Sequence, residues 1–150
     1  MQVKLYVDIC CLKRPFDSQE QALVRLEAEA VATILSLPPE RVTFVRTPAQ
    51  ILENRLNPVR WRREAVAIWL HSVPAVVLDE RELERRTAEI IALGFKSFDA
   101  FHVASAEACA DVLITVDERF RKKAERLDPP LRVRVTSPLV VAQEVLEWKT

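Results

Sequence analysis

Short apolar runs alternate along the chain with longer segments in which apolar residues recur every three or four positions. The short runs have the length of buried strands, and the longer segments have the period of helices. Strands that are apolar on both faces and alternate with helices are typical of a parallel sheet covered by helices on each side. We therefore predict an α/β fold, a three-layer sandwich with a mostly parallel central sheet. The expected strands are Val3–Val7, Val42–Val45, Ala75–Leu78, Val112–Val116 and Val133–Val135.

The first long helix is expected soon after the first strand. Ser18 followed by Gln21 has the spacing of a capping box, in which side chains satisfy the free N–H groups of a helix start. The helix should run to about Leu35, where the Pro38-Pro39 pair follows. Its apolar face should contain Leu23, Leu26, Ala30 and Ile34.

Caps and breakers also mark the later helices. Thr47 and Gln50 form a second capping box, with Pro48 at the first helical position. Further helices are expected at about Val59–Leu70, at Glu80–Leu93 between a cap at Asp79 and a closing Gly94, from Ser97 to about Ala110, at Glu118–Arg126, and from Pro138 onward. Trp61, Trp69 and Trp148 are expected in the core or in dimer contacts.

The composition fits a single domain over residues 1–150, with 49% hydrophobic residues for its core. Lys plus Arg and Asp plus Glu both number 22, so the net charge of zero neither supports nor opposes a nucleic-acid partner. Gly94 is the only glycine. This excludes a glycine-rich phosphate-binding loop and a Gly-x-Ser-x-Gly nucleophile elbow.

The cysteines and the absence of long apolar segments favour a cytoplasmic protein. Cys10, Cys11 and Cys109 are odd in number and include an adjacent pair, which is a poor disulfide framework and lacks zinc-ligand spacing. Reduced thiols fit the cytoplasm. The apolar run after Lys4 has strand length and does not predict a signal peptide. No stretch is long enough to cross a bilayer, so no membrane partner is expected.

Four carboxylates occupy positions that can meet at one edge of the predicted sheet. Asp8 and Asp117 directly follow strands, and ligands bind beyond the carboxyl ends of parallel strands. Glu53 and Asp99 lie early in helices that can face the same edge. Each acid except Asp99 is also explained singly as a helix cap or dipole partner. Asp99 has apolar neighbours, so its helix should be largely buried.

Four acids in one pocket would repel each other unless a cation were present. Mg²⁺ or Mn²⁺ suits an all-oxygen carboxylate site, and such ions can activate water against a phosphodiester. Basic residues near Asp117 can hold the phosphates, and the candidates are Arg119, Arg121 and Lys122. Arg60–Arg63 form another basic segment, and both segments are equally explained as solvated helix faces.

Two other features near the acids have simpler interpretations. His102 lies three residues after Asp99 on the same helix face. A metal role is possible, but the favoured interpretation is a partly buried imidazole that is hydrogen-bonded nearby, because a hard cation prefers oxygen ligands. Cys10 and Cys11 are expected to be packing residues, because a nearby carboxylate raises the pKa of a thiol.

These segments together resemble the PIN domain, a nuclease fold that includes VapC-type toxins. The resemblance covers nearly the whole chain. "LYVDICCLKRPFD" resembles the opening strand and first acid, and "TPAQILENRLNP" the helical glutamate motif. "KSFDAFHVASAEACADVLITVDERF" resembles the remaining motifs. The acids of the family then correspond to Asp8, Glu53, Asp99 and Asp117, and Thr115 matches a supporting hydroxyl position.

The resemblance implies Mg²⁺- or Mn²⁺-dependent cleavage of RNA, a homodimer in many members, and, for toxins, an antitoxin that covers the acidic pocket. The chain departs from toxins at Ile9-Cys10-Cys11, where they often have a small polar residue. One alternative is a catalytically silent PIN-like module that binds RNA or protein. Another is a haloacid dehalogenase-like phosphohydrolase, which would require Asp-x-Asp, whereas Cys10 stands two residues after Asp8.

Overall fold

A parallel sheet forms the centre of the computed structural model, which describes residues 2–147 apart from the side chain of Leu146. Within that range its strands are β1 (Val3–Val7), β2 (Val42–Phe44), β3 (Val112–Ile114) and β4 (Arg134–Thr136). The spatial order is β2-β1-β3-β4, and every pairing is parallel. In this register Leu5 lies beside Phe44 on one side and Val112 on the other. The central strands β1 and β3 therefore end at the same edge.

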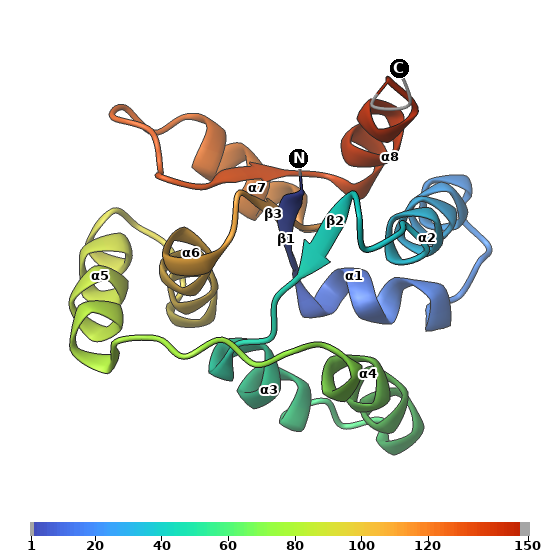
Figure 1. The fold of residues 1–150 in the computed structure, drawn as a ribbon, viewed down its shortest axis with the longest axis horizontal. Helices are drawn as coiled ribbons and strands as arrows, with labels where there is room; N and C mark the ends of the chain where they lie inside the picture. The colour runs from blue at the N-terminus through green and yellow to red at the C-terminus, as the bar shows by residue number, and fades with distance from the viewer. Residues whose placement is uncertain (1, 148–150) are drawn as a thin grey trace.

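Helices cover both faces of this sheet (Figure 1). The cluster on one face contains residues of α1, α2, α4 and α8, and the cluster on the other face contains residues of α5, α6 and α7. The helix α3 lies beyond the carboxyl ends of β1 and β2 (Figure 1). The helical bounds are α1 Ile9–Lys13, the 3₁₀ turn η1 Arg14–Phe16, α2 Ala22–Leu35, α3 Pro48–Arg55, α4 Arg60–Ser72, α5 Glu80–Ala92, α6 Ser97–Cys109, α7 Glu118–Glu125 and α8 Pro138–Glu147.

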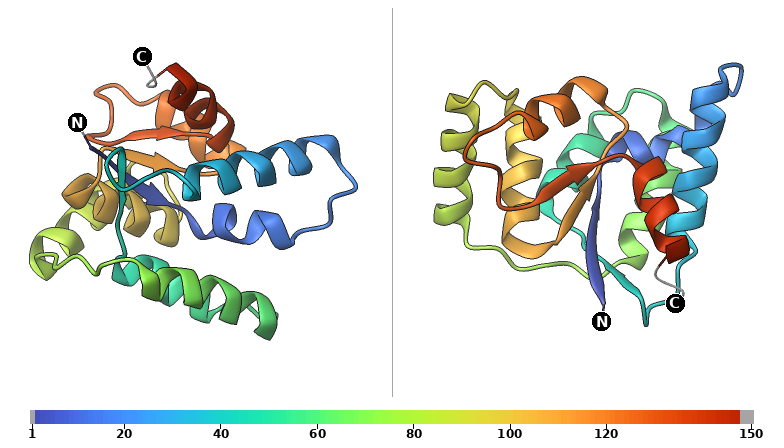
Figure 2. Two further views of the ribbon diagram at one scale, coloured as in Figure 1. Left: turned by 45° about the vertical axis from the view of Figure 1, so that its right-hand side comes forward. Right: turned by 90° about the horizontal axis from the view of Figure 1, so that it is seen from above.

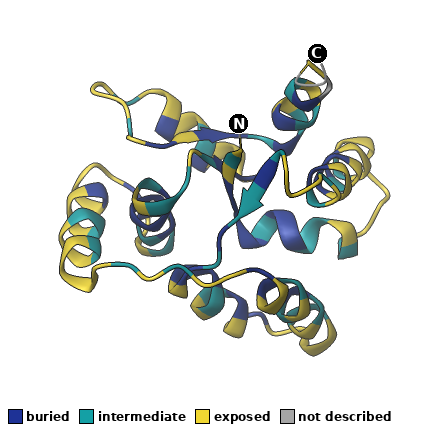
Figure 3. Ribbon diagram, in the orientation of Figure 1, coloured by how far each residue is buried: buried dark blue, intermediate teal, exposed yellow. Residues whose placement is uncertain are grey.

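The side chains of β1 explain why the sheet is buried on both sides. Successive residues of a strand point to opposite faces. Leu5 and Val7 enter the cluster with α1, α2, α4 and α8, whereas Tyr6 between them enters the cluster with α5, α6 and α7. Most strand residues are buried or intermediate in the burial colouring, and the exposed residues lie mainly on the outer sides of the helices and in loops (Figure 3). The predicted three-layer α/β sandwich is confirmed.

The third predicted strand, Ala75–Leu78, does not form. Only a single parallel bridge joins Ala75 to Arg46. The Arg46 N–H donates to the Pro74 carbonyl, and the Val76 N–H donates to the Arg46 carbonyl. After this contact the chain leaves the sheet, and Val77 is 96% exposed. The apolar run was too short to distinguish a buried strand from an exposed connection.

The start of α2 also differs from the prediction. The helix begins at Ala22 with Gln21 as its N-cap, so the capping box at Ser18 is wrong. Arg25 instead reaches back to the carbonyls of residues 19 and 20, which keeps that segment in turns. Leu23 and Leu26 are exposed, because the first turns of α2 project beyond the sheet with the loop before them (Figure 2).

Three of the other predicted caps, Thr47, Asp79 and Gly94, fit the structure, and the fourth is displaced by one residue. The capping box of Thr47 and Gln50 is present at α3, and Asp79 accepts two backbone N–H groups at the start of α5. Gly94 follows α5 with a φ of 103°, a left-handed conformation that other residues adopt with strain. Lys96, not Ser97, is the N-cap of α6.

The tryptophans have different surroundings. Trp69 packs edge-to-face on Phe44 beside the core, as predicted. Trp61 is exposed and contacts the ring of Phe16 and the guanidinium of Arg62. Trp148 lies outside the described residues.

Candidate metal centre

Asp8 stands at the point where β1 ends, between the sheet and α1. Its N–H donates to the Ile114 carbonyl at 2.9 Å, which extends the pairing of β1 with β3. Its Oδ2 accepts hydrogen bonds from Thr115 Oγ1 at 2.8 Å and from Cys10 Sγ at 3.2 Å. The residue is only 5% exposed, and this burial is the main reason that the pKa of Asp8 is raised. A buried carboxylate in this state requires compensation by a positive charge or a proton.

The thiol of Cys10 is part of this arrangement. Besides donating to Asp8, its Sγ lies 3.3 Å from Thr115 Oγ1. Hydrogen bonding with Cys11, burial and the charge of Asp8 all raise the pKa of Cys10. Cys11 is buried in the core and donates to the Ile114 carbonyl at 3.4 Å. The packing interpretation holds for Cys11, whereas Cys10 also makes a hydrogen bond to Asp8.

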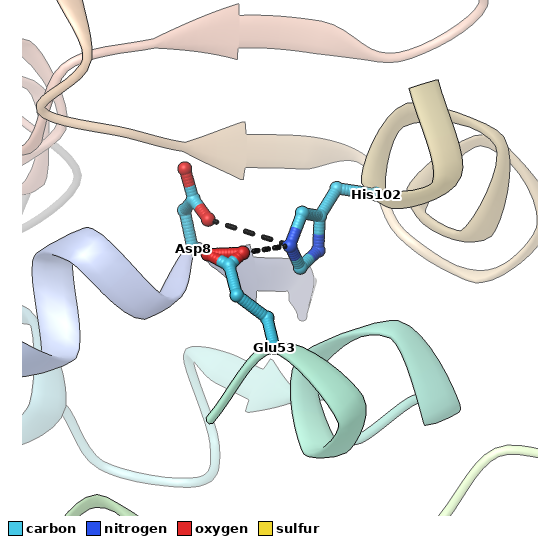
Figure 4. Close-up of side chains that lie close together, drawn as sticks. All are labelled: Asp8, Glu53 and His102. Carbon is cyan, nitrogen blue, oxygen red and sulfur yellow. Dashed lines mark hydrogen bonds and ion pairs between the residues drawn. The ribbon is translucent and has the colours of Figure 1, made fainter. Parts of the chain in front are cut away.

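Glu53 from α3 and His102 from α6 meet Asp8. We call these three residues the inner cluster. Glu53 Oε2 lies 2.7 Å from His102 Nε2, and Asp8 Oδ1 lies 3.8 Å from the same nitrogen (Figure 4). Ligand atoms of the three residues all lie within 4.8 Å of one another. Burial disfavours the charged imidazole, but Glu53 and Asp8 outweigh this effect and raise the pKa of His102.

A buried hydrogen-bond network holds the other side of the His102 ring. Its Nδ1 lies 2.5 Å from the Tyr6 hydroxyl, which accepts a hydrogen bond from Thr47 Oγ1 at 3.1 Å. Thr47 Oγ1 also lies 3.3 Å from Gln50 Oε1, and Gln50 Nε2 donates to the Val7 carbonyl at 2.9 Å. The capping box of α3 thus connects β1 to α6 through the imidazole.

The remaining predicted acids lie toward solvent. Asp99 is in the first turn of α6 and half-buried, and its pKa is raised to about 6 by burial and by the charges of Asp8 and Asp117. Asp117 is exposed and caps α7, with Oδ1 accepting from the Phe120 N–H at 3.1 Å. The Asp117 N–H donates to Thr115 Oγ1, so Thr115 ties this turn to Asp8.

The four predicted acids are therefore brought to one edge of the sheet, but not equally close together. Asp99 is near enough to Asp8 and Asp117 for their charges to raise its pKa. Asp99 and Asp117 do not belong to the inner cluster. His102 does belong to it, which sequence reasoning had not favoured. The available signal was the spacing between Asp99 and His102, which places both on one face of α6.

A cavity of about 550 Å³ opens beside the two outer acids. Asp99 and Asp117 line it, together with the side chains of α7 and of the segment before α6. Its basic lining residues are Lys96, Arg119, Lys122, Lys123 and Arg126. Of the predicted phosphate-binding residues, Arg119 and Lys122 line the cavity, whereas Arg121 does not and pairs with Glu125 at 3.1 Å.

The second basic segment, Arg60–Arg63, has mostly internal partners. Arg60 pairs with Glu64, and Arg62 pairs with Asp17. Arg63 donates to the Asn57 carbonyl at 2.7 Å. The interpretation as a helix face with local partners therefore fits this segment.

The donor set of the inner cluster fits a divalent cation. Both side-chain donors to the Asp8 carboxylate, Cys10 and Thr115, bind Oδ2. Among the described residues, none donates a hydrogen bond to Oδ1. Oδ1 and Glu53 Oε2 both point toward His102 Nε2 (Figure 4). Carboxylate oxygens suit Mg²⁺ and Mn²⁺, and an imidazole nitrogen adds a preference for transition metals.

Comparison with known proteins supports the fold. FitAcB from Neisseria gonorrhoeae has a TM-score of 0.51 and 15% identity over 89% of this chain and 97% of its own. PAE2754 from Pyrobaculum aerophilum has a TM-score of 0.53 and 16% identity over 98% and 99%. No protein-family model and no curated protein matches the chain. At these identities the likeness concerns the fold alone, which is PIN-like α/β.

The helices of residues 2–147 include none with both the length and the apolar character required to cross a bilayer.

Proposed function

We propose that this protein is a divalent-metal-dependent ribonuclease that hydrolyses phosphodiester bonds of RNA, with Asp8, Glu53, Asp99 and Asp117 as its acidic site. The observation that carries the proposal is the burial of Asp8 beside Glu53 and Asp99, all at the carboxyl edge of β1 and β3. Such a group of carboxylates is stabilised by a divalent cation, and Mg²⁺ or Mn²⁺ is the cofactor that oxygen donors favour.

When bound, the ion supplies an activated water and stabilises the leaving oxygen. The residues of the chain have separate parts. Thr115 donates to Asp8 and accepts from the Asp117 backbone, and so fixes the spacing between two of the acids. Asp99 and Asp117 line the cavity, and Asp99 lies near enough to Asp8 for the two charges to interact, so the two outer acids can orient a water against a phosphate.

The cavity offers a site for the RNA backbone. Among the described residues, no carboxylate forms an ion pair with Lys96, Arg119 or Arg126, so their charges are available to phosphates. Lys123 donates to the Gly94 carbonyl and is partly engaged. A polyanion that crosses this cavity would pass directly beside Asp99 and Asp117.

The test is divalent-dependent cleavage of a defined single-stranded RNA, compared between wild type and Asp99→Asn. We expect wild type to cleave in Mg²⁺ or Mn²⁺ and to stop in chelator, and the variant to lose at least about a hundredfold in rate, by analogy with the loss of a transition-state contact. Glu40→Gln is the matched control, because Glu40 is exposed in the turn before β2, away from the site. Equal cleavage by wild type and Asp99→Asn would make the assignment wrong.

The resemblance to VapC-type proteins extends the proposal to partners. We propose a homodimer, and a toxin whose pocket is covered by an antitoxin. Light scattering should give twice the chain mass of 17.2 kDa. Induction of the wild-type chain should arrest growth of a host, and induction of Asp99→Asn should not. If RNA binds but is not cleaved in any divalent ion, the silent binding module is the better description.

A further inference from the structure

The imidazole of His102 occupies the position from which a nitrogen ligand would reach an ion held by Asp8 and Glu53. The side chain is 1% exposed and enters the site from α6, while Glu53 enters from α3 (Figure 4). Its Nε2 lies 2.7 Å from Glu53 Oε2 and 3.8 Å from Asp8 Oδ1. In the metal-free chain the Nε2 proton therefore lies where the two carboxylates converge.

From this geometry we propose that His102 Nε2 is a direct ligand of the divalent ion, and that it makes the site prefer Mn²⁺ over Mg²⁺. The proposal rests on the metal site of the proposed function and adds to it a nitrogen donor. Mg²⁺ prefers oxygen, whereas affinity for an imidazole rises along the transition metals. A site with carboxylates alone would not make this distinction as strongly.

The network behind the ring has the form that metal-bound histidines require. A ligating imidazole donates its other N–H to a fixed acceptor, which sets the ring orientation. Here the acceptor is the Tyr6 hydroxyl, 2.5 Å from Nδ1. The Thr47 hydroxyl has two acceptors within reach, Tyr6 at 3.1 Å and Gln50 Oε1 at 3.3 Å.

This choice of acceptors lets the network change direction. When Nδ1–H donates to the Tyr6 oxygen, the Tyr6 O–H can donate to Thr47 Oγ1. The Thr47 O–H can then donate to Gln50 Oε1. Every proton then has an acceptor. On the other side of the ring, Nε2 gives up its proton as it binds the ion. From an imidazolium this proton goes to solvent and Nδ1 keeps its own, whereas in a neutral ring with its proton on Nε2, Nδ1 takes up a proton in exchange and none is released overall. The hydrogen bond to Glu53 and the bond to the metal are thus alternatives at the same nitrogen.

Pulsed electron paramagnetic resonance of the Mn²⁺-loaded protein tests this directly, because a coordinated imidazole couples its nitrogen nucleus to the electron spin. The chain has two histidines, and His71 is exposed on α4, with Nδ1 next to the Ala67 carbonyl. We expect nitrogen coupling in wild type and in His71→Gln, and its loss in His102→Gln. A second measurement, the ratio of Mn²⁺ to Mg²⁺ affinity, should fall about tenfold or more in His102→Gln and stay constant in His71→Gln.

If His102→Gln does not fold, the same resonance experiment can be done on wild type alone. Wild type grown with ¹⁵N-labelled histidine should replace the ¹⁴N modulation by that of ¹⁵N. Absence of histidine coupling in wild type, or coupling that persists in His102→Gln, would overturn the proposal, as would failure to bind Mn²⁺. The ribonuclease proposal is judged separately by cleavage, since RNA can be cleaved without nitrogen coupling and coupling can occur without cleavage.

Discussion

The ionisation of Asp99 affects the stability of the protein when no metal ion is bound. Its pKa is about 6 in the folded chain, whereas an unfolded aspartate titrates near about 3.9. Between these values the folded state holds a proton that the unfolded state has lost. Stability therefore falls as the pH rises from about 4 to about 6, and the loss remains above that range.

We predict that Asp99→Asn removes this loss. In chelator at about pH 7, the variant should be more stable than wild type by about 1 kcal/mol, a figure reduced for solvent screening because Asp99 is half-exposed. At about pH 4 the two proteins should unfold alike. Urea unfolding at both pH values measures the difference, and an equal pH dependence in the two proteins would contradict the prediction. The same substitution is expected to abolish cleavage, so the site is maintained at a cost in stability.

At the scale of residues, the sequence predicted which strand ends and helix starts carry the acids, but not which side chains contact each other there. Asp8 and Asp117 were located because each directly follows an apolar run, and Asp99 by its place in a helix start. The meeting of His102 with Glu53 depends on how α6 and α3 approach each other, 49 residues apart in sequence. Cys10 was understood as a packing residue because its hydrogen bond to Asp8 requires the turn of α1.

At the scale of elements, α3 carries both a ligand and the support for another. Thr47 caps the helix and donates to Tyr6, which holds the His102 ring. We predict that Thr47→Ala lowers the free energy of unfolding by about 2 kcal/mol, since a lost N-cap costs about 1–2 kcal/mol and Tyr6 loses a buried partner. Thr47→Ser keeps the hydroxyl and should lose less than about half of that. Denaturant unfolding of the two variants measures these losses. Equal losses in free energy of unfolding would mean that the methyl group of Thr47, not its hydroxyl, is responsible.

Basic side chains of α7 lie on different faces of the helix, one toward the cavity and one away from it. Arg119 lines the cavity, whereas Arg121 pairs with Glu125. We predict that Arg119→Ala weakens binding of single-stranded RNA in chelator and reduces the salt dependence of log K by about 0.7 for each lost phosphate contact. Arg121→Ala is the control on the same helix and should leave both unchanged. Filter binding across a salt series measures this, and equal effects of the two substitutions would place the RNA elsewhere.

Element boundaries were predicted best where the signal is local. The capping box of Thr47 and Gln50 and the single glycine are local signals, and α3 and the end of α5 fit them, whereas the equally local capping box at Ser18 does not form. The helix α1 was missed because five residues give too little periodicity for a prediction. Two predictions were wrong: the strand at Ala75–Leu78 and the burial of Leu23 and Leu26. Both depend on how far the sheet extends, and the local sequence pattern does not contain this information.

At the scale of the whole molecule, the inner cluster joins β1, α3 and α6. An ion that binds only the folded chain stabilises all of it, by about 2.7 kcal/mol at a hundred times its dissociation constant. We predict a stabilisation of this size by Mn²⁺ in thermal or denaturant unfolding of wild type. Asp8→Asn should remove most of it, because Asp8 is the most buried of the four acids. A similar gain in Asp8→Asn would mean that Mn²⁺ binds at another place.

The order of strands in the sheet has a consequence for the synthesis of this protein. β3 lies between β1 and β4, although it is made more than a hundred residues after β1. A chain still on the ribosome, with β3 inside the exit tunnel, holds Asp8 and Glu53 but has no Thr115 to orient Asp8 and no Asp117 to complete the site. If the chain cleaves RNA, it cannot cleave its own message before β3 and the residues that follow it have left the ribosome.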